Sequence, residues 1–214
     1  PISMALLLIV LYRHHRQFSN KIVDISPSKN CINEKVSNCF ERVWYELLRM
    51  NRLWLVSDIS YSETKKNHAG ADMLYNRQKM EVSDQLPEGL YSNQSIVVCK
   101  TSSIEIIFTP DKVIIIEKSR SVTVIFNKDL EINISNILYV EDEKIPEDAI
   151  VNRYVWEHPN KDGSPDRRYK QNEQLPECMY ATIQIGSMNQ NINIIFLASC
   201  YKTAQTMRKI FMML

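Results

Sequence analysis

The side chains best suited to binding chemistry lie in one polar segment, residues 152–180. Basic residues are interleaved there with aromatic rings, and the sequence Lys-Asp-Gly at 161–163 is typical of a turn. A guanidinium binds a carboxylate or another oxyanion through two parallel hydrogen bonds, and lysine adds a positive charge. The segment therefore predicts a surface that binds an anion or a peptide carboxylate. The residues expected to form this surface are Tyr154, Trp156, Lys161, Asp166, Arg167, Arg168, Tyr169 and Lys170.

The same charges could instead brace the segment internally. Arg167 and Arg168 are adjacent, and neighbouring residues of an extended chain point in opposite directions. One arginine can therefore pair with Asp166 and pin the loop while the other points to solvent. In that arrangement the aromatic side chains of the segment would form a small core of their own. The sequence leaves both roles open, and the two can share one loop.

An enzymatic alternative rests on Asp111, Asp142 and Lys144. Pro-Asp at 110–111 followed by Asp-Glu-Lys at 142–144 fits the PD-DxK pattern of metal-dependent nucleases. In such a site two carboxylates hold Mg²⁺ beside the phosphodiester, and the lysine lies near the attacking water. However, Pro-Asp is also typical of a hairpin turn, and the surrounding residues predict strands without the helices that a nuclease core needs. A non-enzymatic binding or scaffolding module is therefore the leading interpretation, with the nuclease as its competitor.

Binding of single-stranded nucleic acid is a further alternative. The aromatic and basic residues between Tyr154 and Tyr169 could stack on unpaired bases. The formal net charge of the whole chain is only +1, which is too small to mark a dedicated nucleic-acid-binding protein. A protein or peptide is therefore the expected partner.

Neither a cofactor nor a metal ion is expected from the remaining reactive residues. The five cysteines are odd in number and form no Cys-x-x-Cys pair, which argues against a disulfide framework and a zinc site. They predict reduced thiols in a cytoplasmic protein. His14 and His15 are adjacent on a predicted helix and face different directions, while His68 and His158 are isolated. With four glycines in all, the chain also lacks a glycine-rich phosphate loop.

Length and composition indicate the kind of fold that must position these side chains. The chain has 214 residues, of which 44% are hydrophobic and 24% charged, as in an ordinary globular protein. Residues 1–51 predict a helical hairpin built from helices at 3–19 and 33–50. The second of these carries apolar residues at the i, i+3, i+4, i+7 spacing of one buried stripe.

The first apolar run, residues 2–12, permits two interpretations. It is too short to span a bilayer, which needs roughly 20 residues, so a helix buried in the core is favoured. The competing interpretation is the end of a truncated transmembrane helix, with the basic residues at 13–16 on the cytoplasmic side. The protein is accordingly expected in the cytoplasm, with a position at the inner face of a membrane as the alternative.

The rest of the chain, residues 52–214, is rich in β-branched residues and short turns, which predicts antiparallel strands. After a first strand that starts near residue 52, the expected strands are residues 95–100, 104–109, 112–118, 122–127, 130–140, 179–185 and 192–197. An amphipathic helix is expected over 200–214. About seven antiparallel strands closed by one helix are the outline of a pleckstrin-homology-like (PH-like) barrel or sandwich, so the predicted class is α+β.

A resemblance to a known family covers the polar segment. Residues 156–180 read WEHPNKDGSPDRRYKQNEQLPECMY. They are similar to a motif of an uncharacterised bacterial protein family, W-x(3)-NKxGxPDRR[FY]-x(2)-N-x(2)-LP, whose specific core falls on residues 160–169. Ser164 and Tyr169 stand at positions where the family is expected to have glycine and phenylalanine. The resemblance implies a PH-like β domain and carries no activity.

Overall fold

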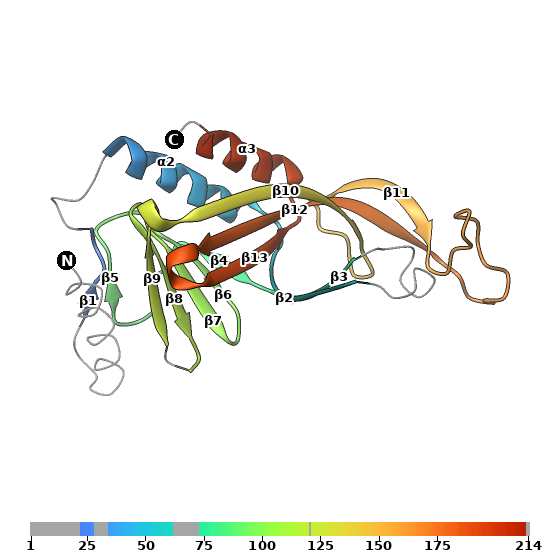
Figure 1. The fold of residues 1–214 in the computed structure, drawn as a ribbon, viewed down its shortest axis with the longest axis horizontal. Helices are drawn as coiled ribbons and strands as arrows, with labels where there is room; N and C mark the ends of the chain where they lie inside the picture. Colours follow the sequence, from blue (N-terminus) through green and yellow to red (C-terminus); the bar gives the residue numbers. More distant parts are fainter. Residues whose placement is uncertain (1–21, 28–33, 62–72, 120, 213–214) are drawn as a thin grey trace.

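The computed structural model of the protein describes residues 22–27, 34–61, 73–119 and 121–212. Antiparallel strands are the main secondary structure of the described residues, and two α-helices pack beside them (Figure 1). The predicted α+β class is therefore confirmed. Among the described residues, no helix is both long enough and apolar enough to cross a membrane. The apolar run at residues 2–12 lies outside the described residues.

The larger sheet has six strands. Its order is β10-β12-β13-β2-β3, and β11 is a further strand that pairs with β12. The bounds are β2 Leu53–Tyr61, β3 Met73–Lys79, β10 Glu131–Val140, β11 Ile150–Trp156, β12 Gln174–Ser187 and β13 Ile192–Ala198. β12 is the longest strand, and it pairs with β10 on one edge and with β13 and then β11 on the other.

The second sheet has five strands in the order β4-β6-β7-β8-β9, as expected for consecutive hairpins of β-branched residues. The bounds are β4 Glu81–Ser83, β6 Val97–Lys100, β7 Ile104–Phe108, β8 Lys112–Glu117 and β9 Val122–Phe126. β1 (Val23–Asp24) and β5 (Leu90–Tyr91) form a separate, parallel two-stranded sheet that pairs with neither of the larger sheets. The strands predicted over 95–140 are thus confirmed.

Of the predicted PH-like barrel or sandwich, the closed barrel is wrong, because the two larger sheets remain separate. The chain leaves the five-stranded sheet through η3, a short helical turn at Asn127–Asp129, so β9 and β10 do not pair. It also passes from β3 to β4 through the single buried residue Met80. At the second corner the ladder of β2 with β3 ends on Met80, whose N–H donates to the carbonyl of Leu53 at 2.9 Å. The two sheets then share one apolar core.

Both helices pack on the sheets and on each other. α2 (Glu34–Tyr45) runs into the short turn η1 (Glu46–Arg49), and α3 (Tyr201–Phe211) ends the described chain. The Phe211 ring lies 5.6 Å from the Phe40 ring and 5.8 Å from the Trp44 ring. The predicted N-terminal helical hairpin is not supported, because its first helix, residues 3–19, lies outside the described residues and α2 packs against α3. The C-terminal helix is confirmed.

Three clusters of buried apolar side chains form the core. The largest joins both helices to the two large sheets, so α2 shares one core with the strands. The second lies on the opposite face of the five-stranded sheet, where β1 contributes Val23. The third lies on the opposite face of the six-stranded sheet, around Trp54 and Tyr180, and Ile145 and Ala149 pack against it.

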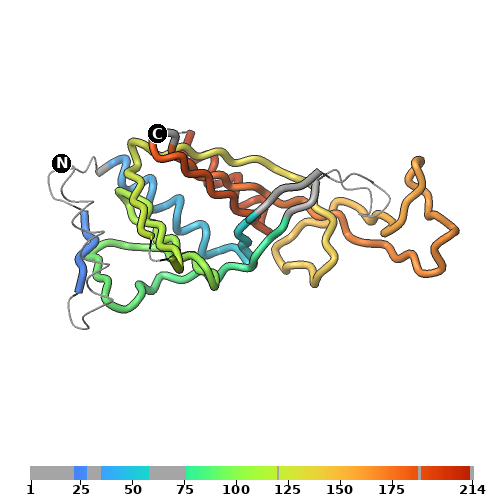
Figure 2. Tube along the Cα trace, turned by 60° about the horizontal axis from the view of Figure 1, so that its bottom comes forward, coloured from blue at the N-terminus to red at the C-terminus, as the bar shows by residue number. Residues whose placement is uncertain are grey.

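A β-ribbon extends from this body along its longest axis. We call residues 150–179 the arm: β11 pairs with the first part of β12, and residues 157–173, the tip, connect them (Figure 1). A second view also shows the tip at one end of the molecule, far from the helices (Figure 2). No residue between 152 and 177 belongs to any of the three core clusters. The arm therefore places its tip away from the core that stabilises the fold.

Candidate functional site

The tip continues the β-ribbon of the arm. β11 and β12 pair from Ile150 opposite Met179 to Trp156 opposite Gln174, with a bulge between Val151 and Arg153. The backbone N–H of Glu157 then donates to the carbonyl of Glu173 at 2.8 Å. The segment predicted as one polar loop from residue 154 to 170 is thus partly strand, because Tyr154 and Trp156 belong to β11.

Side-chain amides hold the tip in one conformation. The Asn172 side chain accepts from the N–H of His158 at 2.9 Å and donates to the carbonyl of the same residue at 2.8 Å. The Asn160 side chain donates to the carbonyl of Pro165 at 3.1 Å and thereby closes the outer turn. Gly163 has φ +84° in this turn, a value that residues with a side chain rarely adopt. The tip is therefore an ordered turn.

Asp166 is the centre of the tip, with 4% of its surface exposed. Its carboxylate accepts hydrogen bonds from Nε of Arg168 at 2.9 and 3.1 Å, and Nη2 of the same guanidinium makes a further short contact. The backbone N–H of Arg168 also donates to it at 3.1 Å. The hydrogen bond to Asp166 raises the pKa of Arg168. Of the two adjacent arginines, Arg168 is therefore the one that braces the loop.

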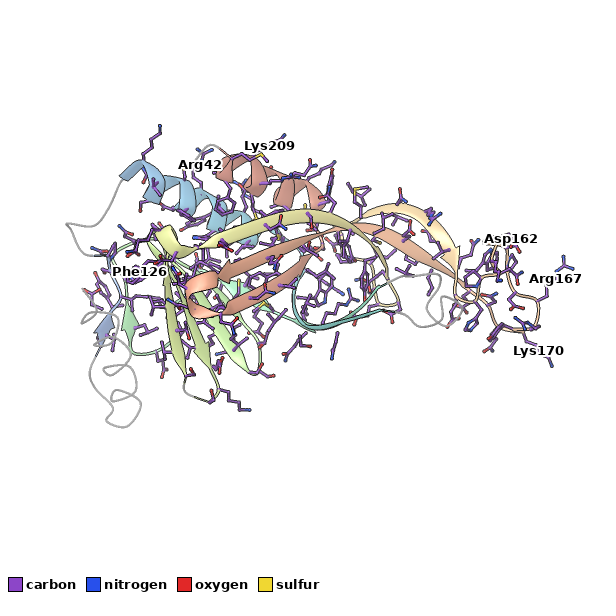
Figure 3. All side chains as sticks on the ribbon, in the orientation of Figure 1. Arg42, Phe126, Asp162, Arg167, Lys170 and Lys209 are labelled. Atoms are coloured by element: carbon purple, nitrogen blue, oxygen red, sulfur yellow. The ribbon has the colours of Figure 1, made fainter. Side chains whose placement is uncertain are left out.

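Arg167 points away from the tip into solvent, and Lys170 also extends outward (Figure 3). Lys161 is exposed as well. Within the described part of the chain, no hydrogen bond or ion pair engages these three cations. The tip also carries four acidic residues against four basic ones, so its net charge is zero. The acidic residues differ in placement: Asp166 is paired, Glu157 and Glu173 lie at the base of the tip, and Asp162 accepts from Ser164.

The aromatic residues of the segment do not form a common core. Tyr154 is 58% exposed and lies opposite Pro176, whereas Trp156 is half-buried opposite Gln174. Tyr169 stacks on the His158 ring with a centroid distance of 3.8 Å and keeps 39% of its surface exposed. The exposed face of Tyr169 therefore remains available for contact in the tip, and that of Tyr154 on β11.

A second polar cluster, which the sequence did not predict, lies at the root of the arm. Arg77 on β3 reaches Glu141, the residue that follows β10, with Nη2 at 2.5 Å and Nη1 at 3.0 Å from the carboxylate oxygens. The Tyr180 hydroxyl donates to the same carboxylate at 2.6 Å. The Arg77 guanidinium also lies 4.4 Å from the Trp54 ring centroid and 4.5 Å from that of Tyr139. This arginine is thus enclosed by two rings and a carboxylate.

The electrostatics of this cluster follow from burial and charge pairing. Burial acts to raise the pKa of Glu141, but hydrogen bonds from Arg77 and Tyr180 outweigh it, so the pKa lies below its ordinary value. Burial raises the pKa of Tyr180, and its hydrogen bond to Glu141 raises it further. The cluster therefore holds one buried ion pair with a neutral hydroxyl, and its donors and acceptors satisfy one another. Nothing in this arrangement presents a free group to a substrate.

The residues of the predicted nuclease site lie far apart. Asp111 is in the turn between β7 and β8, where it pairs with Lys112 at 3.0 Å and its carbonyl accepts from the N–H of Asn127. Asp142 follows the far end of β10, a strand of 10 residues that starts just after Asn127. At about 3.3 Å per residue, that strand separates the two carboxylates by roughly 30 Å. One metal ion cannot bridge them, and no group of three or more metal-binding side chains occurs among the described residues.

Comparison of the chain with known proteins gave no match. No protein-family model, no curated protein and no solved structure matches the chain.

Proposed function

We propose that the protein is a non-enzymatic binding module that recognises an acidic segment of a partner protein with the tip of its arm. The observation that carries the proposal is the separation of tip and core. Residues 152–177 contribute nothing to the three apolar clusters, yet side-chain amides and an ion pair order the tip. An ordered, protruding turn of this kind has no evident role in stabilising the fold.

The exposed groups at the outer end of the tip define the chemistry of the partner. Lys161, Arg167 and Lys170 offer positive charge, and Arg167 offers a planar donor fork that fits a carboxylate. The Asp166–Arg168 pair holds the backbone on which Arg167 is mounted. Because the turn is ordered before binding, less conformational freedom is lost when a partner binds. The exposed faces of Tyr154 and Tyr169 add apolar contact area.

The placement of the chain is part of the same proposal. We expect a cytoplasmic protein, and the apolar run at residues 2–12 allows a position at the inner face of a membrane. Membership of the bacterial family with the core motif at residues 160–169 also stays a proposal. Binding of single-stranded nucleic acid is the alternative partner class, because Tyr154 and Tyr169 could stack on bases.

Affinity capture with matched variants tests the proposal. The tip variant replaces Lys161, Arg167 and Lys170 with alanine, and the control variant replaces Arg42 and Lys209, exposed cations on α2 and α3 (Figure 3). All five positions are exposed, so the free energy of unfolding should change by less than about 0.5 kcal/mol per substitution. Proteins captured by the wild type and the control, and lost with the tip variant, are the expected result. Equal capture by all three chains contradicts the proposal. If the wild type and the control bind a labelled oligonucleotide and the tip variant does not, the partner is nucleic acid instead.

A further inference from the structure

The outer edge of β11 has unused backbone hydrogen-bonding groups. In an antiparallel ladder, residues point their N–H and C=O alternately toward one neighbour and away from it. The backbone N–H of Glu157 donates to the carbonyl of Glu173 across the ribbon. The backbone N–H and C=O groups of Val155 and Arg153, two and four residues earlier, therefore also point toward β12. Tyr154 and Trp156 therefore direct both backbone groups away from β12. Within the described residues, none of these four groups is hydrogen-bonded.

Pro176 supports this assignment independently. Its carbonyl accepts from the N–H of Glu141, the residue after β10, so it faces β10 and away from β11. Tyr154 lies opposite Pro176, and the two residues cannot share a hydrogen-bonded position. The outward direction of the Tyr154 backbone thus follows from both edges of β12.

The exposed edge is self-complementary about Val155. If two copies of β11 pair antiparallel with Val155 on the two-fold axis, Tyr154 lies opposite Trp156 of the second copy. Each such pair can exchange both of its backbone hydrogen bonds. The same register sets Arg153 opposite Glu157 of the second copy; Arg153 pairs with Glu177 of its own chain at 2.8 Å, and its side chain remains 65% exposed to a second carboxylate. Opposite charges and aromatic rings in facing positions both stabilise a strand pair.

The structure also limits how far this pairing can extend. The bulge between Val151 and Arg153 interrupts the edge on the side of the body. Pro159, which has no N–H, ends it on the side of the tip. A short edge that pairs with itself about a two-fold axis closes after two copies and cannot grow into a fibre.

We propose that β11 is a self-association edge through which two copies of the chain pair arm to arm as a weak, closed dimer. The contact is smaller than the roughly 1,200 Å² of a standard stable interface, so the dimer forms in a concentration-dependent way. This inference goes beyond the recognition of a partner by the tip, because the pairing uses the backbone of β11 and leaves Lys161, Arg167 and Lys170 exposed.

Sedimentation equilibrium of the full chain tests the dimer. Tyr154→Pro removes one outward N–H at an edge position, where proline is tolerated, and should leave the chain monomeric. Glu157→Lys sets two cations opposite each other and should raise the dimer Kd about fivefold. Glu173→Lys makes the same charge change on the other side of the arm and should leave the Kd unchanged.

Three results overturn the inference. The first is a wild-type chain that remains monomeric at about 1 mM, a concentration at which even a −4 kcal/mol contact is half formed. The second is a dimer that Glu157→Lys and Glu173→Lys weaken equally. The third is a dimer that a folded Tyr154→Pro variant retains. The tip variant with alanine at 161, 167 and 170 should dimerise like the wild type, so failure of the dimer and failure of partner recognition are separate outcomes.

Discussion

Removal of the Arg77 side chain should cost far more stability than removal of any arginine at the surface. Side-chain exposure is 7% for Arg77 and 0% for Glu141, so Arg77→Ala leaves a buried carboxylate without its counter-ion. Loss of one partner of a buried pair typically costs about 3–5 kcal/mol. The same change removes the contacts of the guanidinium with Trp54 and Tyr139. For a chain of this size, that loss corresponds to a decrease in Tm of about 6–20 °C.

The assay is urea and thermal unfolding followed by tryptophan fluorescence, to which Trp54 contributes directly. Arg49→Ala is the matched control, because Arg49 pairs with Glu46 but its side chain is 72% exposed. An exposed pair of this kind contributes about 0–1 kcal/mol. The double variant Arg77→Met with Glu141→Leu should recover much of the lost stability, since apolar groups then replace both charges. The reasoning is refuted if Arg77→Ala costs no more than Arg49→Ala.

Three further outcomes follow from the described contacts. Because the folded-state pKa of Glu141 is lowered from its ordinary 4.5, its pair stabilises the fold above that pH and loses this contribution as the pH falls through the lower folded value; acid titration of stability should therefore be shallower for Glu141→Gln than for the wild type. Asp166→Asn should speed amide hydrogen exchange at Arg168 and its neighbours while global unfolding in urea stays unchanged, because the tip lies outside the core; a lower global midpoint would contradict this separation. Gly163→Ala should strain the outer turn by about 1 kcal/mol at φ +84°, visible as faster exchange confined to the tip and absent from the β2 amides.

The regular elements of the body could be predicted from the sequence because their patterns are local. Alternating β-branched residues and short turns mark β6 to β9, and an apolar stripe marks α2 and α3. Closure of a barrel, in contrast, depends on which strands pair at the corners. The turn at η3 and the single residue Met80 end the ladders there, and no local periodicity marks such an end.

The arm was predicted only as a loop, for two identifiable reasons. The bulge at Asn152 breaks the alternation of β11, so its period of two is lost over the seven residues of the strand. Pro176 hides the strand pattern at the start of β12, because a proline within a stretch of residues argues against a strand there. The ion pair of Asp166 with one neighbouring arginine was predictable from spacing, but the choice of Arg168 depends on the turn geometry.

The cluster at the root of the arm could not be found from the sequence. Arg77 and Glu141 are 64 residues apart, and β3 and β10 lie at opposite ends of the path through the six-stranded sheet. Only the curvature of the sheet brings them together. The one local signal is Glu141, a carboxylate two positions after Tyr139.

Photo-cross-linking from the tip tests the central claim most directly. A photoreactive residue at Gln171, an exposed position of the tip, should yield a discrete protein adduct in cells. The adduct should be lost when Arg167→Ala is added and retained when Arg42→Ala is added. A photoreactive residue at Lys209 on α3 serves as the control for position. An adduct from Gln171 that persists with Arg167→Ala, or that forms equally from Lys209, would contradict the assignment of the tip as the recognition surface.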